Sequence, residues 1–187
     1  MKSPVLALAL ALAAAGCGPL VPFVPDQAQL PAGALGGGLD PDVTAVNLAQ
    51  YAFADSGRTY GRPVDAARAC ASMLYIAGAL YTSPRWSNIS AITKEQLLQG
   101  RQEVRDALGV APAATAQQVV DGLVGAADAL NAGDQAAAIR ALSGPAFPAG
   151  GEKVLAVLSN LPYLRMANVS TMRAANQLFD NGLDDRF

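Results

Sequence analysis

The stretch that decides the fold is Ala69 to Pro84, which reads ACASMLYIAGALYTSP and contains no charged residue. A helix that is apolar on every side is buried among other helices, and this stretch is shorter than the ~20 residues needed to cross a membrane. Small side chains at Ala71, Ala77 and Gly78 allow neighbouring helices to approach closely. We therefore expect a helix over residues 63–81 at the centre of a bundle.

Segments with helical spacing and recognisable starts flank this central helix. Asp40-Pro41 has the form of a helix start, with an N-cap aspartate followed by proline at the first helical position. Thr93 to Gln96 and Thr115 to Gln118 each fit a capping box, in which the threonine and glutamine side chains satisfy each other's backbone amides. The helices expected are 41–55, 63–81, a short turn after Pro84, 93–108, 116–131, 135–142, 152–161 and 162–181.

Two of these helices carry polar stripes. The charged side chains after Thr93 are expected on the solvent face, and they are Arg101, Glu103, Arg105 and Asp106. The last helix is rich in polar residues that predict a solvent face or a lined groove, namely Asn168, Ser170, Thr171, Asn176 and Gln177. Met172 is expected on the core side of the last helix, and Ile92 belongs to a repeat with Trp86 and Ile89 that predicts a short turn of helix with the tryptophan at the edge of the core.

No segment of useful length alternates apolar and polar residues as a half-buried strand would. The sequence therefore predicts an all-α fold, a single compact bundle of six to seven helices over residues 40–187. The segment before it, from Gly18 to Leu39, is rich in proline and glycine and ends in Gly36-Gly37-Gly38. Such a segment is expected to be a disordered tether with a root-mean-square span of roughly 25 Å.

The N-terminus has the composition of a targeting segment. Lys2 is followed by an apolar run from Val5 to Ala15, and small residues follow up to Gly16. One positive charge, a short apolar run and small residues before a cleavage point are typical of a secretory signal peptide. Residues 1–16 are therefore predicted to be removed, which would leave 171 of the 187 residues.

Cys17 stands directly after these small residues, and this arrangement resembles the lipobox of bacterial lipoproteins. Ala14 stands where leucine is usual in that family. The resemblance implies that the Cys17 thiol is acylated and that the chain is cut just before it. Residues 17–39 would then be a lipidated cysteine and its tether. Gly18 resembles the arrangement in lipoproteins that proceed to the outer membrane.

Composition excludes several classes of function. The chain has no histidine, which excludes a histidine-based catalytic triad and a zinc-hydrolase site and removes the commonest transition-metal ligand. Without Lys2, 12 basic residues face 15 acidic ones, so a nucleic-acid partner, which requires a basic face, has little support. The sequence therefore predicts no cofactor, no metal and no nucleic acid.

A few residues remain as candidates for chemistry or contact. A lipidated Cys17 cannot form a disulfide, and Cys70 lies within the uncharged stretch, where it is expected to be a small core residue. The loop from Arg58 to Arg62 is expected to be a solvated loop or a contact with an anionic headgroup or a partner. The acid and base candidates for an enzyme are the carboxylate pairs Asp121 with Asp128 and Asp65 with Glu95, and neither pair matches a recognised pattern.

These observations favour a non-catalytic protein. The first hypothesis is an accessory or scaffold lipoprotein of a cell-envelope complex, held by lipid on the periplasmic side, at the outer membrane rather than the inner. Its partners would be the membrane, through the anchor, and an envelope protein. The alternative is a carrier or sensor of an apolar ligand such as a lipid, bound between helices around the small residues of the central helix.

Overall fold

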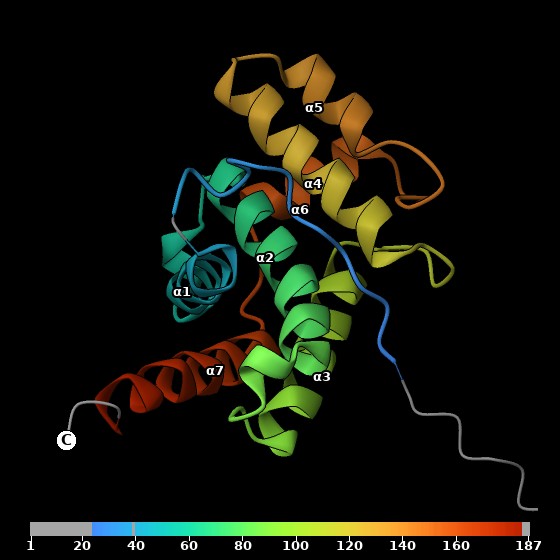
Figure 1. Ribbon diagram of the computed structural model, residues 1–187. Coiled ribbons are helices and arrows are strands. Elements are labelled where there is room, and N and C mark those ends of the chain that lie inside the picture. Colours follow the sequence, from blue (N-terminus) through green and yellow to red (C-terminus); the bar gives the residue numbers. More distant parts are fainter. Residues whose placement is uncertain (1–23, 39, 185–187) are drawn as a thin grey trace, which may run out of the picture.

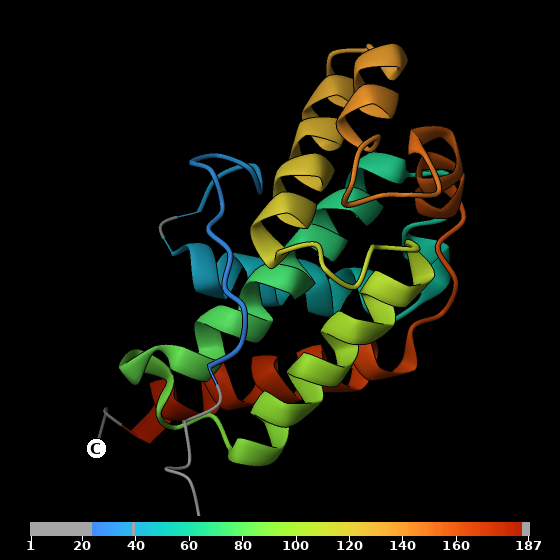
Figure 2. The same ribbon diagram turned by 90° about the vertical axis from the view of Figure 1, so that its right-hand side faces the viewer.

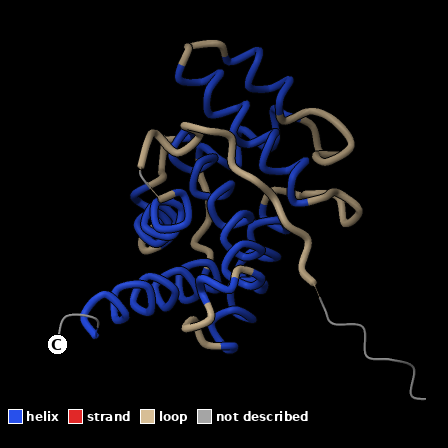
Figure 3. The backbone as a smooth tube through the Cα atoms, viewed as in Figure 1, coloured by secondary structure: helices blue, strands red, loops and turns tan. Residues whose placement is uncertain are grey.

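Every regular element in the described part of the chain, residues 24–38 and 40–184, is a helix in this computed structural model. Figure 3 shows helices joined by loops, with no strand among these residues. The α-helices are α1 (Pro41–Phe53), α2 (Pro63–Thr82), α3 (Ala91–Ala107), α4 (Ala116–Asn131), α5 (Gln135–Ala141), α6 (Gly151–Ser159) and α7 (Arg165–Asp184). Two 3₁₀ helices are η1 (Ser56–Arg58) and η2 (Pro84–Trp86). The predicted all-α bundle is confirmed.

Helix α2 occupies the centre, as its uncharged sequence predicts. It contacts α1, α3, α4 and α6, and Figure 1 shows it in the middle of the molecule. The largest fully buried side chains of α2 are Met73, Leu74, Ile76 and Leu80. Full burial of one such side chain contributes roughly 1.5–3 kcal/mol, so this one helix supplies a large part of the stabilisation of the core.

The other helices pack around α2 in two groups. In one group α3 lies beside α7, and α1 packs against both α7 and α2. In the other group α4 and α5 form an antiparallel hairpin, with α6 packed against α5 and α2. Figure 1 shows the α4–α5 hairpin at the top and the α3–α7 pair at the bottom. Within the described residues, none of the helices combines the length and the hydropathy that a membrane span requires.

Two of the three predicted helix starts are confirmed, and one is wrong. Asp40 caps α1 by accepting from the backbone amides of Asp42 and Val43, and the capping box of Thr115 and Gln118 starts α4, as predicted. The capping box at Thr93 is wrong. Ser90 caps α3 instead, and its hydroxyl accepts from the Thr93 amide at 3.2 Å.

Several side chains lie on the opposite side of their helix from the prediction. Arg105 is buried instead of exposed, because its guanidinium donates to the carbonyl oxygens of Ala111 at 3.0 Å and Ala114 at 2.8 Å. Conversely, Ile92 and Met172 are exposed. Since α3 begins at Ala91, Ile92 lies in its first turn and outside the core.

The polar residues of α7 divide between the interior and the surface. Ser170 and Thr171 are buried, against the prediction, because both hydroxyls donate to the carbonyl oxygen of Ala167, at 3.3 and 2.7 Å. Asn176 and Gln177 line a groove of about 320 Å³ on the surface between α3 and α7. Only these two of the five polar residues line the groove, because Ser170 and Thr171 are buried and Asn168 donates to the Phe53 carbonyl oxygen.

The described part of the expected tether, residues 24–38, is called the strap here. It contains no helix or strand, as its proline and glycine content predicts. It does not hang free, however: it lies along the domain and crosses α2, where Figure 1 shows it in blue. Pro25, Ala28 and Ala34 are buried against the domain. The helical domain therefore carries this irregular segment as part of its packed surface.

Candidate functional site

Cys17 is the residue to which the sequence assigns a specific chemical role, and it lies outside the described residues. Its acylation and the cleavage before it therefore stay predictions. The described chain begins at Val24, so the strap is the first part that the structure places after Cys17.

Asp26 fastens the start of the strap at two points. Its Oδ2 atom accepts from the backbone amide of Ala116 at 2.5 Å, at the N-terminus of α4. A carboxylate is favourable there, because the amides at a helix start carry partial positive charge. Its carbonyl oxygen accepts from the Arg101 guanidinium at 2.7 Å. Farther along, Gln29 and Gln117 exchange two hydrogen bonds, of 2.7 and 3.2 Å.

Gly78 explains why the strap can lie so close to α2. A Cβ atom at this position would lie 3.1 Å from the carbonyl oxygen of Asp26 and 3.2 Å from the Cα atom of Gln27. These distances are shorter than ordinary van der Waals contacts. The small residue in the middle of α2 therefore allows the strap to approach, in addition to any role in helix packing.

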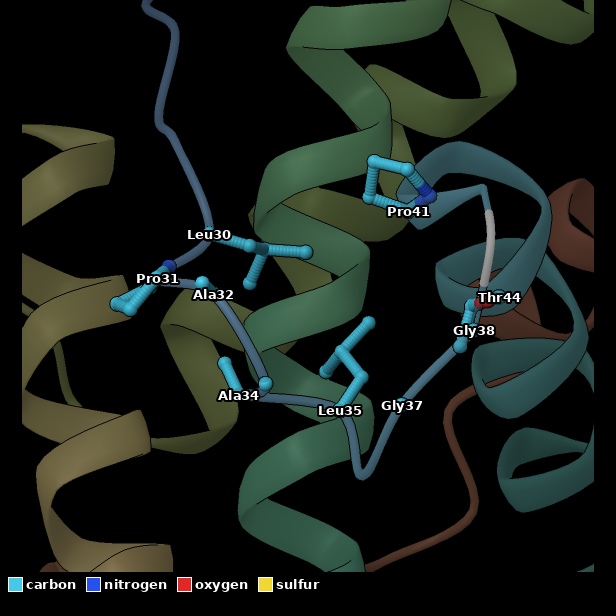
Figure 4. A pocket seen from close by; sticks show the side chains of 10 residues that line it. Leu30, Pro31, Ala32, Ala34, Leu35, Gly37, Gly38, Pro41 and Thr44 are labelled. Atoms are coloured by element: carbon cyan, nitrogen blue, oxygen red, sulfur yellow. The ribbon is translucent and has the colours of Figure 1, made fainter.

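A pocket of about 340 Å³ lies between the strap and the start of α1, and Figure 4 shows it from close by. The residues that line it are mostly apolar and include Leu30, Pro31, Ala34, Leu35, Pro41 and Thr44. Leu30 and Leu35 also pack against the core, and their side chains reach toward α2 in Figure 4. We call this space the strap pocket.

A polar cluster fastens α1, α2 and η2 to one another. Asp42 accepts from the Tyr75 hydroxyl at 2.5 Å and from the Trp86 indole nitrogen at 2.7 Å. Arg85 pairs with Asp40, and its guanidinium lies 4.3 Å from the centre of the Trp86 ring. The Arg85 hydrogen bond lowers the pKa of Asp40, while burial and the hydrogen bond to Asp42 raise the pKa of Tyr75. Each group has a protein partner, so the cluster is a structural junction.

The α1–α2 connection packs against the end of α1 and the α6–α7 connection, and these three segments carry three exposed tyrosines and two arginines. The exposed fractions are 55% for Tyr51, 69% for Tyr60 and 56% for Tyr163. The Arg58 guanidinium lies 4.3 Å from the Tyr51 ring centre and donates to the Tyr51 carbonyl oxygen at 2.8 Å. Arg62 pairs with Asp65 at 2.6 Å. We call Tyr51, Arg58, Tyr60, Arg62 and Tyr163 the tyrosine face.

Backbone contacts hold the parts of the tyrosine face together. The Gly61 amide donates to the Ser159 carbonyl oxygen at 2.9 Å, and the Asn168 side chain donates to the Phe53 carbonyl oxygen at 2.8 Å. A hollow of about 100 Å³ opens in the face beside Tyr51, Arg58 and Arg62. In Figure 2 this end of the molecule lies at the right, whereas the start of the strap lies at the lower left.

Cys70 has no exposed surface, as the sequence predicts for a small core residue. Burial also raises the pKa of its thiol to about 12. A thiol with such a pKa is almost entirely protonated at neutral pH, and the thiolate is the nucleophilic form. Cys70 therefore fills space in the core.

The four carboxylates considered as acid and base candidates each have a partner of their own. Asp121 accepts from Gln117 at 2.7 Å, and Asp128 lies 3.9 Å from the Arg68 guanidinium. Asp65 pairs with Arg62, and Glu95 accepts from the Tyr81 hydroxyl at 3.1 Å. Over residues 24–38 and 40–184, no three His, Cys, Asp or Glu side chains gather in a way that could hold a metal ion.

Sequence reasoning found the loop from Arg58 to Arg62 but missed the two tyrosines that join it. Tyr51 does not lie on the apolar side of α1, which includes the buried residues Val46, Ala49 and Phe53. This position in the helical pattern could have indicated that Tyr51 is exposed. Tyr163 has no comparable signal, because only the packing of the α6–α7 connection brings it to this end of the molecule. Comparison with models of known families, with curated proteins and with solved structures finds no match for this chain.

Proposed function

We propose that this protein is a membrane-anchored lipoprotein of the periplasmic side of the cell envelope, where it acts as a non-catalytic accessory or scaffold protein in an envelope complex. The sequence around Cys17 supports the anchor, and Gly18 favours the outer membrane. Acyl chains contribute ~0.8 kcal/mol per buried methylene, so several chains on one cysteine give lasting attachment.

The observation that carries the proposal is the lipobox-like sequence that ends at Cys17, and the attachment of the strap through Asp26 limits how far such an anchor would lie from the domain. With Asp26 bound to α3 and α4, only the residues between Cys17 and Asp26 remain to connect a lipid with the domain. Nine residue steps span at most ~30 Å. This connection is about two-fifths as long as a free segment up to Leu39 would allow, so the domain would stand close to the bilayer. The tyrosine face lies at the other end and would point away from the anchor.

A substitution at Cys17 tests the anchor. In cells fed an alkyne-tagged fatty acid, we expect the wild type to carry the tag and to sediment with membranes. The Cys17→Ser variant should lose the tag, keep its signal peptide and show altered processing on a gel. Cys70→Ala is the matched control and should behave as the wild type. Unchanged processing and no tag in the wild type would show an ordinary secretory signal and overturn the proposal.

The strap pocket favours a second candidate function, the binding of an apolar ligand such as a lipid chain. Its volume of about 340 Å³ lies within the usual range for small-ligand sites, and its lining is mostly apolar. The pocket lies between the strap and the start of α1, and not between helices around the small residues of α2 as the sequence suggested. Lipid retained in mass spectra of the purified protein, and lost in a Leu35→Asp variant, would support this function over the first.

A further inference from the structure

We propose that the tyrosine face docks an acidic polypeptide segment of an envelope protein, with one carboxylate side chain held between Arg58 and Arg62. This inference rests on the proposed function, because it names the surface through which an anchored accessory protein would work. It also gives that surface a partner of defined chemistry.

The residue types of the tyrosine face are those that dominate binding energy in protein interfaces. Tyrosine and arginine are enriched among interface residues whose loss weakens binding most. Three of the five tyrosines in the chain lie on this face, and each is more than half exposed. A large aromatic ring in water gains free energy when a partner covers it, and its hydroxyl still finds a hydrogen bond at the rim.

The arginines define the charge of the partner. Arg58 is already oriented by its stacking on Tyr51 and by its hydrogen bond to the Tyr51 carbonyl oxygen, so little side-chain freedom is lost when it binds a carboxylate. A guanidinium has five N–H donors, so several remain for a ligand. The Arg62 side chain is more than half exposed, and it forms an ion pair with Asp65. An ion pair so exposed to solvent contributes little to the free energy of folding. A partner carboxylate can therefore share the Arg62 guanidinium.

The hollow between these arginines has a suitable size for one side chain. Its volume is about 100 Å³, its walls include Tyr51, Arg58 and Arg62, and its apolar part is formed by Leu48 and Ala52. A carboxylate head can lie at the guanidinium groups while the methylenes of its stem contact the apolar part. Asp65, which pairs with Arg62, also lines the hollow.

Position and charge argue for a protein rather than a membrane or a second copy. The face lies at the end of the molecule opposite the start of the strap, so an anchor at Cys17 would turn it away from its own bilayer. A twofold pairing of two copies through this face would place the same surface on both sides and bring arginines against arginines. An acidic segment of another protein satisfies both conditions.

Photo-crosslinking in the native cell tests the inference on the full-length, anchored protein. A photoreactive phenylalanine analogue replaces Tyr60, and the matched control places the same analogue at Met172, an exposed apolar position on α7. We expect a discrete adduct from position 60 alone. Tandem mass spectrometry of that adduct should find the crosslink in a segment of the partner that is rich in Asp and Glu.

Charge variants decide whether the arginines recognise this segment. The double variant Arg58→Gln/Arg62→Gln should lower the adduct yield about tenfold or more, whereas Arg173→Gln, another exposed arginine, should leave it unchanged. Circular dichroism before the assay verifies that the variants fold. An adduct with lipid or with a second copy, equal yields from positions 60 and 172, or a yield independent of both arginines would overturn the inference.

The same cells separate this inference from the proposed function. If Cys17 carries the fatty-acid tag but position 60 gives no adduct with an acidic segment, the docking surface is wrong and the anchor stands. If the adduct forms as expected while Cys17 carries no tag, the docking surface stands and the anchor is wrong.

Discussion

At the scale of single residues, two helical glycines with different surroundings give opposite predictions. A Cβ atom at Gly100 would lie 2.9 Å from the Met73 Cε atom and 3.0 Å from the Cα atom of Ala167, so the α3–α7 contact would have to open. Gly100→Ala should lower the free energy of unfolding by about 1–3 kcal/mol. At Gly125 a Cβ atom would meet only Ala141, at an ordinary 3.5 Å. Gly125→Ala should raise stability by about 0.5–1 kcal/mol, since alanine favours the helix.

Urea unfolding followed by circular dichroism measures both glycine variants. The two changes have the same chemistry, a single added methyl group, so the difference in sign isolates the packing of the two sites. Two stabilising shifts would show that helix propensity alone decides these positions, and two destabilising shifts would show that neither site has room for a methyl group.

Cys70 should report global unfolding. In a Cys17→Ser background it is the sole thiol of the chain, and it is fully buried with a pKa raised to about 12. We expect no reaction with a thiol reagent such as Ellman's reagent in native buffer and full reaction in high urea. The labelling rate at intermediate urea should follow the unfolded fraction seen by circular dichroism. Fast labelling in native buffer would show that α2 opens locally.

Asp40 should make stability sensitive to acid. Arg85 lowers its folded-state pKa below the ordinary value of 3.8, so the ion pair contributes fully above that value and is lost as the pH falls through the folded-state pKa. Asparagine is also a good N-cap, so Asp40→Asn removes the charge and keeps the cap. At pH 7 the variant should lose about 0.2–1 kcal/mol of unfolding free energy, and this difference should shrink below pH 4.

A double-mutant cycle controls the Asp40 prediction. In an Arg85→Gln background, the effect of Asp40→Asn should be much smaller, because the partner charge is gone and only the interaction of the carboxylate with the first amides of α1 is left. Urea unfolding between pH 7 and pH 3 provides all the values. A loss that persists undiminished in the Arg85→Gln background would assign the effect to the helix dipole of α1 instead.

At the scale of elements, the strap should be the first segment to detach. Gly78→Leu would push a branched side chain into Asp26 and Gln27, while Gly78→Ala requires a shift of only a few tenths of an ångström. We expect thermolysin to cut the Leu variant near Leu30 and Leu35 much faster than the wild type, with the helical domain left intact. The Ala variant should be cut at nearly the wild-type rate. Equal rates for wild type and Gly78→Leu would show that α2 does not hold the strap.

The helices themselves could be predicted because their signals are local. The uncharged run of α2, the cap at Asp40 and the capping box at Thr115 each depend on neighbours within a few residues, and the structure confirms all three. The start of α3 could not be chosen by the same rule, because Ser90 and Thr93 are both good caps. The structure starts the helix after Ser90, whose backbone amide donates to the Gln177 side chain of α7 at 2.9 Å, a contact that a local pattern does not contain.

Features that depend on distant parts of the chain could not be predicted. Arg105 is buried because the loop after α3 turns back and offers two carbonyl oxygens, and a helical pattern contains no information about that loop. Ser170 is buried because α7 packs against α3, where a Cβ atom at Gly100 would lie 2.9 Å from the Ser170 hydroxyl oxygen. The sequence predicts a free tether where the structure has the strap. The contacts that hold the strap join Asp26 with residues 75 and 90 positions away, and the composition of the segment contains no information about them. The same limit explains why Tyr163 was missing from the sequence-based site.

At the scale of the whole molecule, the positions of the strap and the tyrosine face predict how an anchored protein would be oriented relative to the bilayer. The strap attaches near the N-terminus of α4, and the tyrosine face lies at the other end. If lipid is attached to Cys17, Gln27 should lie near the bilayer and Tyr60 far from it. Because Cys70 is buried, a cysteine introduced on the surface is the accessible thiol in an acylated protein. A dye can therefore be placed at either position without further changes.

Energy transfer to the membrane measures this orientation. The acylated protein, with a donor dye at Gln27→Cys or Tyr60→Cys, is reconstituted in vesicles that contain an acceptor-labelled lipid. We expect clearly stronger transfer from position 27, because the strap leaves a span of at most ~35 Å back to Cys17, and weaker transfer from position 60. Gly78→Leu, which releases the strap, should bring the two values closer together. Equal transfer in the otherwise unchanged protein would mean that the domain tumbles about its anchor, and the tyrosine face would then have no preferred direction.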